Sequence, residues 1–317
     1  MIVPSFNAVN YSLRPSKTIQ RGLIFEGLRL IQDKVAWGRA TYIGLGSVWF
    51  TDFIMAHKIL RLERMISIEA HEIGFSRAKF NKPYRFVRVE HGYSFDVTPR
   101  LFEAKHLQVY PSIIWLDYDE PIGERELEEL RDLVPRLPDN SVLLTTFNAT
   151  DKKYGRSPDL VLARLRELFG EDATSSLQKG DVRELNLASS LAELVMNVIA
   201  NTSRRVAKKN RCLPAFNVVY RDKATMVSVG AVFPSPDIRP AVRDIVGADS
   251  WPGWVERPVL APHLTGKEVS VIQAKLPTRR TLSRETIQAL GFDLEDEQIQ
   301  AFKEFYRHYP TFAQVFS

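Results

Sequence analysis

The chain has 317 residues and 44% hydrophobic content, so it can bury a sizeable core and is not a disordered protein. Its 43 Lys and Arg residues exceed its 38 Asp and Glu residues only slightly, and this balance alone does not argue for nucleic acid. Its one cysteine, Cys212, excludes an internal disulfide and a zinc site built of cysteines, and fits a reducing cytoplasm. Neither a secretory signal nor a transmembrane segment is evident, so we expect a soluble cytoplasmic protein with no membrane contact.

Helices and strands alternate along the first half of the sequence. Apolar residues recur at helical spacing from Thr18 to Gly38, which predicts one long helix. Further on, short apolar runs predict five strands, at 41–43, 65–69, 86–90, 112–116 and 142–146. Helices are predicted between them at 51–60, 72–80 and 123–136. This alternation is typical of a parallel sheet covered by helices on both faces.

Two further β-like runs, at 215–220 and 225–233, follow a long helix predicted at 186–209. Only four residues join the two runs, so these strands must be antiparallel to each other. Five alternating strands followed by a helix and a terminal antiparallel pair match the seven-stranded, Rossmann-like methyltransferase sheet better than the six parallel strands of a dehydrogenase. We therefore predict an α/β fold of the methyltransferase type.

The predicted sheet suggests a division of the chain into three parts. We expect an N-terminal cap and helix at 1–38 and a Rossmann-like domain at 39–233, with an insertion near 151–185 that carries a helix. Residues 234–317 are rich in proline and form a C-terminal α/β appendage. In it we expect one strand and two helices, at 269–274, 283–289 and 295–308.

A glycine turn follows the first predicted strand, with the sequence Gly44-Leu45-Gly46-Ser47. Such a turn is a weak signal alone, but Glu69 ends the next strand and Gly92-Tyr93-Ser94 follows the third. Together they predict a nucleotide-type cofactor site in which the glycines allow close approach, Glu69 accepts hydrogen bonds from ribose, and residues 92–94 lie beside adenine. Ordinary turn glycines and a surface carboxylate are the alternative. Trp49 occupies the place of a third glycine, which argues against an NAD-dependent oxidoreductase.

Carboxylates stand where the fourth predicted strand ends. Asp117 and Asp119 are expected at the carboxyl edge of the sheet, where substrates of open α/β sheets bind. A carboxylate there could take a proton from an attacking hydroxyl or amine, or hold a cation. Asn148, after the fifth strand, could complete an oxygen-rich site. Capping of the strand ends is the alternative, and because no metal-ligand spacing is evident we predict no metal.

The segment before the first helix carries charges that could face a ligand. Tyr11, Arg14 and Lys17 could close over the site as a lid and contact substrate, together with Tyr118 on the fourth strand. A solvated loop is the alternative for the N-terminal segment.

The densest basic run follows the long predicted helix, at Arg204, Arg205, Lys208, Lys209 and Arg211. Cations at a helix C-terminus are favoured by the helix dipole, so a solvated helix end is the default interpretation. A surface for nucleic acid or a protein partner is the alternative.

Four motifs together resemble a known family: Asn10-Tyr11-Ser12-Leu13-Arg14-Pro15-x-Lys17, Tyr42-Ile43-Gly44-Leu45-Gly46-Ser47 with Phe50-x-Asp52-Phe53, Met65-Ile66-Ser67-Ile68-Glu69, and Trp115-Leu116-Asp117-Tyr118-Asp119. They are similar to a bacterial group labelled putative O-methyltransferases, which resemble class I enzymes dependent on S-adenosylmethionine. The likeness covers about the first 150 residues. No Asp/Asn-Pro-Pro-Tyr/Phe motif stands at the fourth strand, so adenine methylation is disfavoured, and the Asp-Asn pair of cation-dependent catechol-type enzymes is missing.

The resemblance implies that S-adenosylmethionine is the cofactor, held by residues 44–47, Glu69 and residues 92–94. Asp117, with Asp119 or Asn148, would orient or deprotonate an oxygen or nitrogen nucleophile of unknown identity. The rival hypothesis is a catalytically silent Rossmann-like module that binds a protein or nucleic acid.

Overall fold

A computed structural model describes residues 14–206, 212–279 and 282–310. Its centre is one seven-stranded sheet with the order β3-β2-β1-β4-β5-β7-β6. The strands are β1 (Thr41–Leu45), β2 (Met65–Glu69), β3 (Val87–His91), β4 (Ser112–Pro121), β5 (Ser141–Asn148), β6 (Leu213–Arg221) and β7 (Thr225–Phe233). The first five are parallel, whereas β7 is antiparallel to both β5 and β6. The predicted α/β fold with its terminal antiparallel pair is confirmed.

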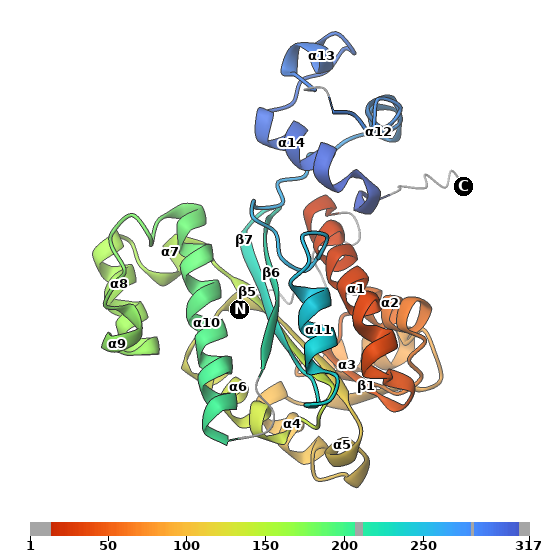
Figure 1. Cartoon of the computed structure of the whole chain (residues 1–317), viewed down its shortest axis with the longest axis vertical. Coiled ribbons are helices and arrows are strands. Elements are labelled where there is room, and N and C mark those ends of the chain that lie inside the picture. The colour runs from red at the N-terminus through yellow and green to blue at the C-terminus, as the bar shows by residue number, and fades with distance from the viewer. Residues whose placement is uncertain (1–13, 207–211, 280–281, 311–317) are drawn as a thin grey trace.

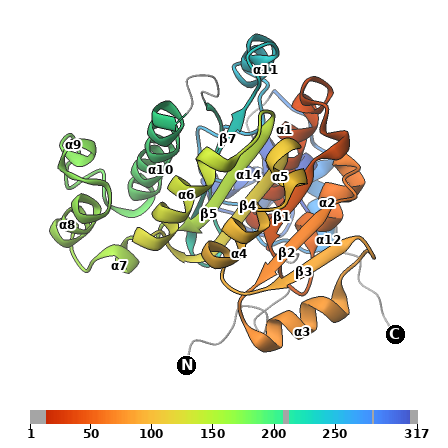
Figure 2. The ribbon, with the colours of Figure 1, turned by 90° about the horizontal axis from the view of Figure 1, so that it is seen from below.

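Helices cover both faces of this sheet (Figures 1 and 2). They are α1 (Pro15–Val35), α2 (Thr51–Leu60), α3 (Glu72–Asn81), α4 (Ser94–Leu101), α5 (Lys105–Val109), α6 (Glu124–Arg136), α7 (Asp151–Tyr154), α8 (Pro158–Phe169), α9 (Glu171–Thr174), α10 (Glu184–Val206), α11 (Arg239–Val246), α12 (Gly266–Gln273), α13 (Arg284–Gln288) and α14 (Asp296–Phe305), with short 3-10 turns η3 (Trp37–Arg39) and η4 (Tyr306–His308). No described helix is both long and apolar enough to cross a lipid bilayer.

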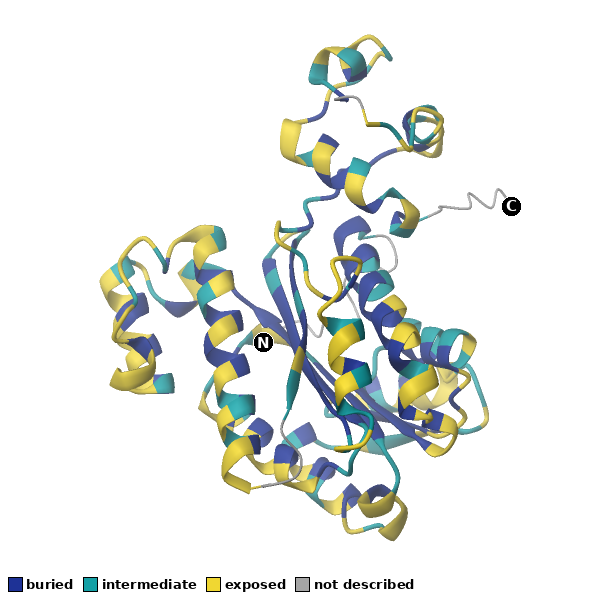
Figure 3. Cartoon of the chain, viewed as in Figure 1, coloured by how far each residue is buried: buried dark blue, intermediate teal, exposed yellow. Residues whose placement is uncertain are grey.

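The central strands are buried on both faces, as Figure 3 shows in dark blue, whereas the edge strand β3 is mostly half-buried or exposed. Alternate side chains of β1 illustrate why: Tyr42 packs with α1 and α2, and Ile43 packs in the core that includes α6 and α10. Such continuous apolar strands are typical of a parallel sheet between two helical layers. The helical layers leave the carboxyl edge of the sheet uncovered, and polar side chains of the turns lie there.

Hydrogen bonds tie the start of α1 to the turn between β6 and β7. Pro15 stands in the first turn, where its missing N–H costs nothing. The backbone N–H groups of Ser16 and Lys17 donate to the two carboxylate oxygens of Asp222, each at 3.1 Å. Asp222 lies in the turn between β6 and β7, so this turn fixes the position of α1 over the sheet.

Replacing Asp222 with alanine is expected to lower the free energy of unfolding by about 1 to 2 kcal/mol, because two N–H groups of the first helical turn lose their acceptor. Urea unfolding measures the change. Lys223→Ala, in the same turn but exposed, is the matched control and should change stability by less than about 0.5 kcal/mol. Equal losses in both variants would contradict the capping role.

The C-terminal segment departs from prediction at one element. The strand expected at 269–274 is wrong, because residues 266–273 form α12. Thr265 accepts from the Glu268 N–H while the Glu268 side chain accepts from the Thr265 N–H, a capping box that signals a helix start. Val269 and Ile272 are buried three residues apart, which is a helical spacing. The predicted helices at 283–289 and 295–308 are confirmed as α13 and as α14 with η4.

The helices α12, α13 and α14 of this C-terminal segment form a lobe beyond the sheet, next to the start of α1 (Figure 1). Its buried residues, including Phe302 and Phe305, form one cluster with Ile19 and Leu23 of α1 and with Tyr220 of β6. The segment therefore lies close to the N-terminal half of α1, which faces the carboxyl edge of the sheet.

Candidate active site

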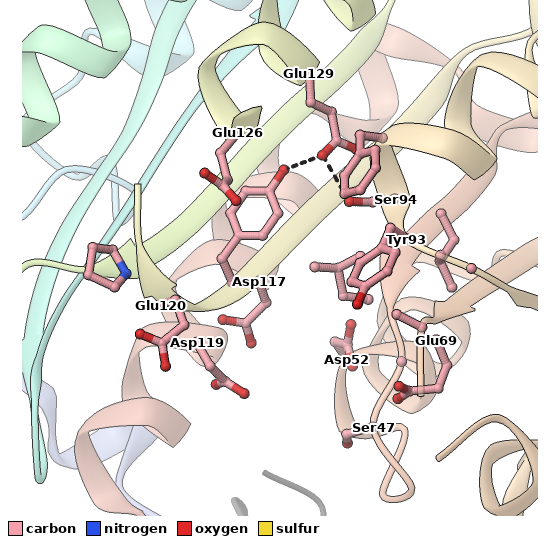
Figure 4. A pocket seen from close by; sticks show the side chains of 18 of the residues that line it. Ser47, Asp52, Glu69, Tyr93, Ser94, Asp117, Asp119, Glu120, Glu126 and Glu129 are labelled. Carbon is pink, nitrogen blue, oxygen red and sulfur yellow. Dashed lines mark hydrogen bonds between the residues drawn. The ribbon is translucent and has the colours of Figure 1, made fainter. Parts of the chain in front are cut away.

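A cavity of about 380 Å³ opens at the carboxyl edge of the parallel strands. Its walls come from the turns after β1, β2 and β3, from the end of β4, and from one face each of α1 and α6. This is the position where ligands of open α/β sheets bind, and the volume is in the range of about 300 to 1,000 Å³ typical of small-molecule sites. Figure 4 shows Ser47, Glu69 and Tyr93 on one side of it and Asp117, Asp119 and Glu120 on the other.

The glycine turn after β1 brings its backbone to this cavity. Gly46 lies so near β2 that a Cβ there would overlap the Ser67 hydroxyl oxygen, and its N–H donates to the Ile68 carbonyl at 3.0 Å. Leu45, Gly46 and Ser47 line the cavity. A side chain at Gly46 would fill the space between the two turns, so a glycine is required for this close approach.

Glu69, at the end of β2, presents a half-buried carboxylate to the cavity. Its Oε1 accepts from the His71 N–H at 2.9 Å, which fixes the side chain and leaves Oε2 for a ligand. Burial raises the pKa of Glu69 above its ordinary value, against the smaller opposing effect of the bond from His71. The group is thus a positioned acceptor that is costly to leave without a partner.

The turn after β3 lies beside Glu69. Gly92 adopts φ of 138°, a conformation that favours glycine, and its N–H donates to the Glu69 carbonyl at 3.1 Å. Tyr93 stacks on Phe95 with 5.2 Å between ring centroids, and Gly92, Tyr93, Ser94 and Phe95 all line the cavity. The turn offers an aromatic wall next to a carboxylate.

Asp117 is the centre of a buried ion cluster that the sequence did not predict. Its Oδ2 lies 3.2 Å from Lys17 Nζ and 2.9 Å from an Arg21 nitrogen, and these side chains are only 15%, 6% and 11% exposed. Its Oδ1 is buried and lacks a hydrogen-bond partner within the described ranges. Lys17 and Arg21 stand four residues apart, so one face of α1 supplies both cations.

The charges in this cluster shift each other's pKa values. Burial alone would raise the pKa of Asp117, but the positive charges of Lys17 and Arg21 together hold it below its ordinary value. Burial lowers the pKa of Lys17, and the attraction of Asp117 only partly offsets this. Asp117 therefore stays ionised and is a weak base.

Glu129 of α6 forms a second buried polar group in the cavity wall. It accepts from Ser94 Oγ at 2.8 Å and from the Tyr118 hydroxyl at 2.7 Å, while its other oxygen is buried without a partner in the part of the chain described. Burial raises the pKa of Glu129. Tyr118, predicted to contact substrate, thus commits its hydroxyl to Glu129 although it lines the cavity.

Several predicted residues lie outside the wall of this cavity. Gly44 is covered by Asp52, whose Oδ2 would be 3.3 Å from a Cβ at that position. Arg14 and Asn148 line a smaller cavity of about 100 Å³, which shares Lys17 and Asp119 with the first. Tyr11 lies outside the described residues.

Sequence reasoning missed five charged residues of the cavity wall: Arg21, Asp52, Glu120, Glu126 and Glu129. Arg21 was detectable, because it stands one helical turn after Lys17. Asp52, which accepts a 2.7 Å hydrogen bond from the Tyr42 hydroxyl, belongs to a motif that carried the family resemblance. Nothing local in α6 distinguishes Glu126 or Glu129 from its other glutamates.

Two further sequence expectations concern other parts of the molecule. Within the ranges described, no three His, Cys, Asp or Glu side chains are arranged as a metal site. Of the basic run, Arg204 and Arg205 are exposed in the last turn of α10, and Arg204 donates to Asn201. Lys208, Lys209 and Arg211 lie outside the described residues.

Several solved structures are similar to this chain at low sequence identity. Trm1 from Pyrococcus horikoshii, in complex with S-adenosyl-L-methionine, is 13% identical with a TM-score of 0.48, over 74% of this chain and 59% of that chain. A putative caffeoyl-CoA O-methyltransferase from Staphylococcus aureus is 14% identical with a TM-score of 0.34, over 65% and 82%. Aeropyrum pernix fibrillarin, with natively bound S-adenosyl-L-methionine, is 8% identical with a TM-score of 0.36, over 61% and 66%. The chain thus spans 59% of the length of Trm1.

Among curated proteins, none matches the sequence. A family model does match, over residues 9–317, which extends well beyond the 150 residues that carried the resemblance. That range includes every described residue of the cavity wall and the C-terminal helices. The chain belongs to the family described as "Putative O-methyltransferase".

Proposed function

We propose that the protein transfers a methyl group from S-adenosylmethionine to an oxygen or nitrogen atom of an acceptor. The observation that carries this proposal is the convergence of three strand-end turns and Asp117 on one cavity. Gly46 and Ser47 would hold the methionine part, Glu69 the ribose hydroxyls, and the 92–94 turn the adenine. Membership of the family supports this assignment.

The residues present fit such a cofactor. The backbone of Gly46 lines the cavity without a side chain, and Glu69 has one oxygen already fixed and one available for two adjacent hydroxyls. Tyr93, whose ring is exposed and stacks on Phe95, offers a ring face for a purine. A dinucleotide is a poorer match, because Trp49 replaces the third glycine of its binding turn and the sheet ends in an antiparallel pair.

When bound, the cofactor supplies an electrophilic sulfonium methyl group. Asp117 is too strongly stabilised by its two cations to be a good base, so it would orient the acceptor by accepting a hydrogen bond on Oδ1. Asp119 is exposed in the same cavity and has no ion-pair partner among the residues described, so it would take the acceptor's proton. Catalysis would come mainly from positioning the attacking atom.

Calorimetric titration of the full chain tests this proposal. We expect S-adenosylmethionine and S-adenosylhomocysteine to bind with one site per chain, and NAD to produce no saturable heat. The reason is that the pocket offers one ribose acceptor and a single glycine turn. Absence of binding by both sulfur compounds, together with salt-sensitive binding of RNA or DNA, would overturn the proposal in favour of a silent binding module.

A further inference from the structure

A second cavity of about 380 Å³ adjoins the candidate active site. α1 contributes Lys17, Arg21 and Gly22, α2 contributes Thr51, and the C-terminal segment contributes Arg307 and His308. Lys17 and Arg21 also line the first cavity, so the two spaces meet at the ion cluster around Asp117. A ligand in the second cavity would therefore lie against Lys17 and Arg21, the two cations that hold Asp117.

The lining of this cavity carries the cationic side chains of Lys17, Arg21 and Arg307. Among the lining residues that the structure describes there is no Asp or Glu. Behind it, Asp117 pairs with both cations of α1, and the Asp52 carboxylate also acts on Arg21. Arg307 is exposed and adds a positive charge to the lining. Such a surface with low-dielectric walls attracts anions.

Donor groups remain available in this lining. Arg21 gives one terminal nitrogen to Asp117, while its buried Nε has no hydrogen-bond partner within the described ranges. Thr51 opens α2, whose N-cap residue, Phe50, provides no side-chain hydrogen bond to the free N–H groups. A helix start and guanidinium groups both favour carboxylate or phosphate oxygens.

The shape of the cavity depends on a close contact between α1 and the C-terminal segment. A Cβ at Gly22 would lie only 2.7 Å from His308 Nδ1, so the missing side chain lets η4 pack against α1. His308 Nε2 in turn lies 2.9 Å from Glu26 Oε2, one helical turn further along α1. This contact holds Arg307 at the rim, facing the cations of α1.

We propose that this second cavity binds an anionic group, a carboxylate or a phosphate, of the methyl acceptor. The inference rests on the proposed methyltransferase function and defines its substrate class. Arg307 and Arg21 bind the anionic group, and this places the nucleophilic atom of the acceptor beside Asp117. The C-terminal segment is then a specificity element, since it supplies Arg307.

Titration of the full chain with small anions tests the assignment. The chain is first saturated with S-adenosylhomocysteine, which fills the neighbouring cofactor site, and then titrated at constant ionic strength with inorganic phosphate or with citrate. We expect saturable binding of at least one anion, and a loss of affinity of at least about fivefold in Arg307→Gln, in line with one charge-assisted hydrogen bond. Preference for phosphate or for citrate separates a phosphate-bearing acceptor from a carboxylate-bearing one.

Arg164→Gln is the matched control, because it removes the same charge from α8, which packs on the opposite face of the sheet. It should bind both anions as the parent does. No anion binding by a chain that binds S-adenosylhomocysteine, or equal affinities in Arg307→Gln and the parent, would overturn this inference and leave the cofactor assignment standing. If the chain binds no S-adenosylhomocysteine but shows Arg307-dependent anion binding, the methyltransferase proposal fails while the anion site is retained.

Discussion

Replacing Asp117 with asparagine is expected to lower the free energy of unfolding by about 3 kcal/mol and methyl transfer by about a hundredfold or more. The carboxylate holds Lys17 and Arg21, two cations with less than an eighth of their side-chain surface exposed. Without it both charges remain buried and lack their counter-ion, and an uncompensated buried charge strongly destabilises the folded state. Activity falls because the acceptor loses the oxygen that orients it. Urea unfolding and a methyl-transfer assay with the identified acceptor measure the two effects.

The stability loss should depend on pH. Burial already lowers the pKa of Lys17 in the folded protein, and removal of Asp117 lowers it further. Between this folded pKa and the higher unfolded one, the unfolded chain binds more protons, so stability rises with pH. The gap between the folded and unfolded pKa of Lys17 is larger in Asp117→Asn than in the parent. The difference in the free energy of unfolding between the two proteins should therefore shrink as pH rises from about 6 toward the ordinary Lys pKa of about 10.4. A difference independent of pH would argue against Lys17 as the source of the cost.

Two variants test whether unpaired cations cause the loss. Asp119→Asn makes the same chemical change at an exposed position in the same cavity, and should alter stability by less than about 0.5 kcal/mol. Adding Lys17→Met to Asp117→Asn replaces one buried charge with an apolar chain and should recover part of the stability. A double variant less stable than Asp117→Asn would contradict this explanation.

Glu69→Ala is expected to weaken binding of S-adenosylmethionine about 30-fold, the equivalent of about 2 kcal/mol for hydrogen bonds to a charged acceptor. The free oxygen of Glu69 faces the cavity while the other is held by the His71 N–H. Affinity in the parent should also fall as pH drops through the raised pKa of Glu69, because protonation removes acceptor capacity. Calorimetry at two pH values measures both effects.

Glu72→Ala is the control for this variant. Glu72 stands three residues further along the chain, in the first turn of α3, and its side chain is 77% exposed. It should bind the cofactor with the affinity of the parent. A Glu69→Ala protein that binds S-adenosylmethionine as tightly as the parent would place the ribose elsewhere in the cavity.

Local patterns were sufficient for most of the fold. The strand at 65–69 and the helix at 51–60 were predicted to the residue, because a short apolar run and a helical periodicity can each be read from a few consecutive side chains. The segment at 269–274 was not, since its β-branched residues favour a strand unless the capping box at Thr265 is weighed against them. The short helix α4, which contains Pro99, was not predicted, although its buried residues Ser94, Val97, Thr98 and Leu101 follow a helical spacing.

For the site, the sequence by itself indicated the turns that meet at the carboxyl edge: residues 45–47, Glu69 and residues 92–94 line the cavity, whereas Gly44, also predicted, does not. Each follows a predictable strand, and parallel strands place such turns together. Only the tertiary structure decided what Asp117 does. Its partners Lys17 and Arg21 are 100 and 96 residues away in sequence, and Asp222, which anchors the start of α1, is 205 residues from Lys17. Such contacts depend on how whole elements pack, so they leave no trace in the neighbouring residues. They hold Asp117, which was expected to orient or deprotonate the acceptor, as an anchored, ionised group.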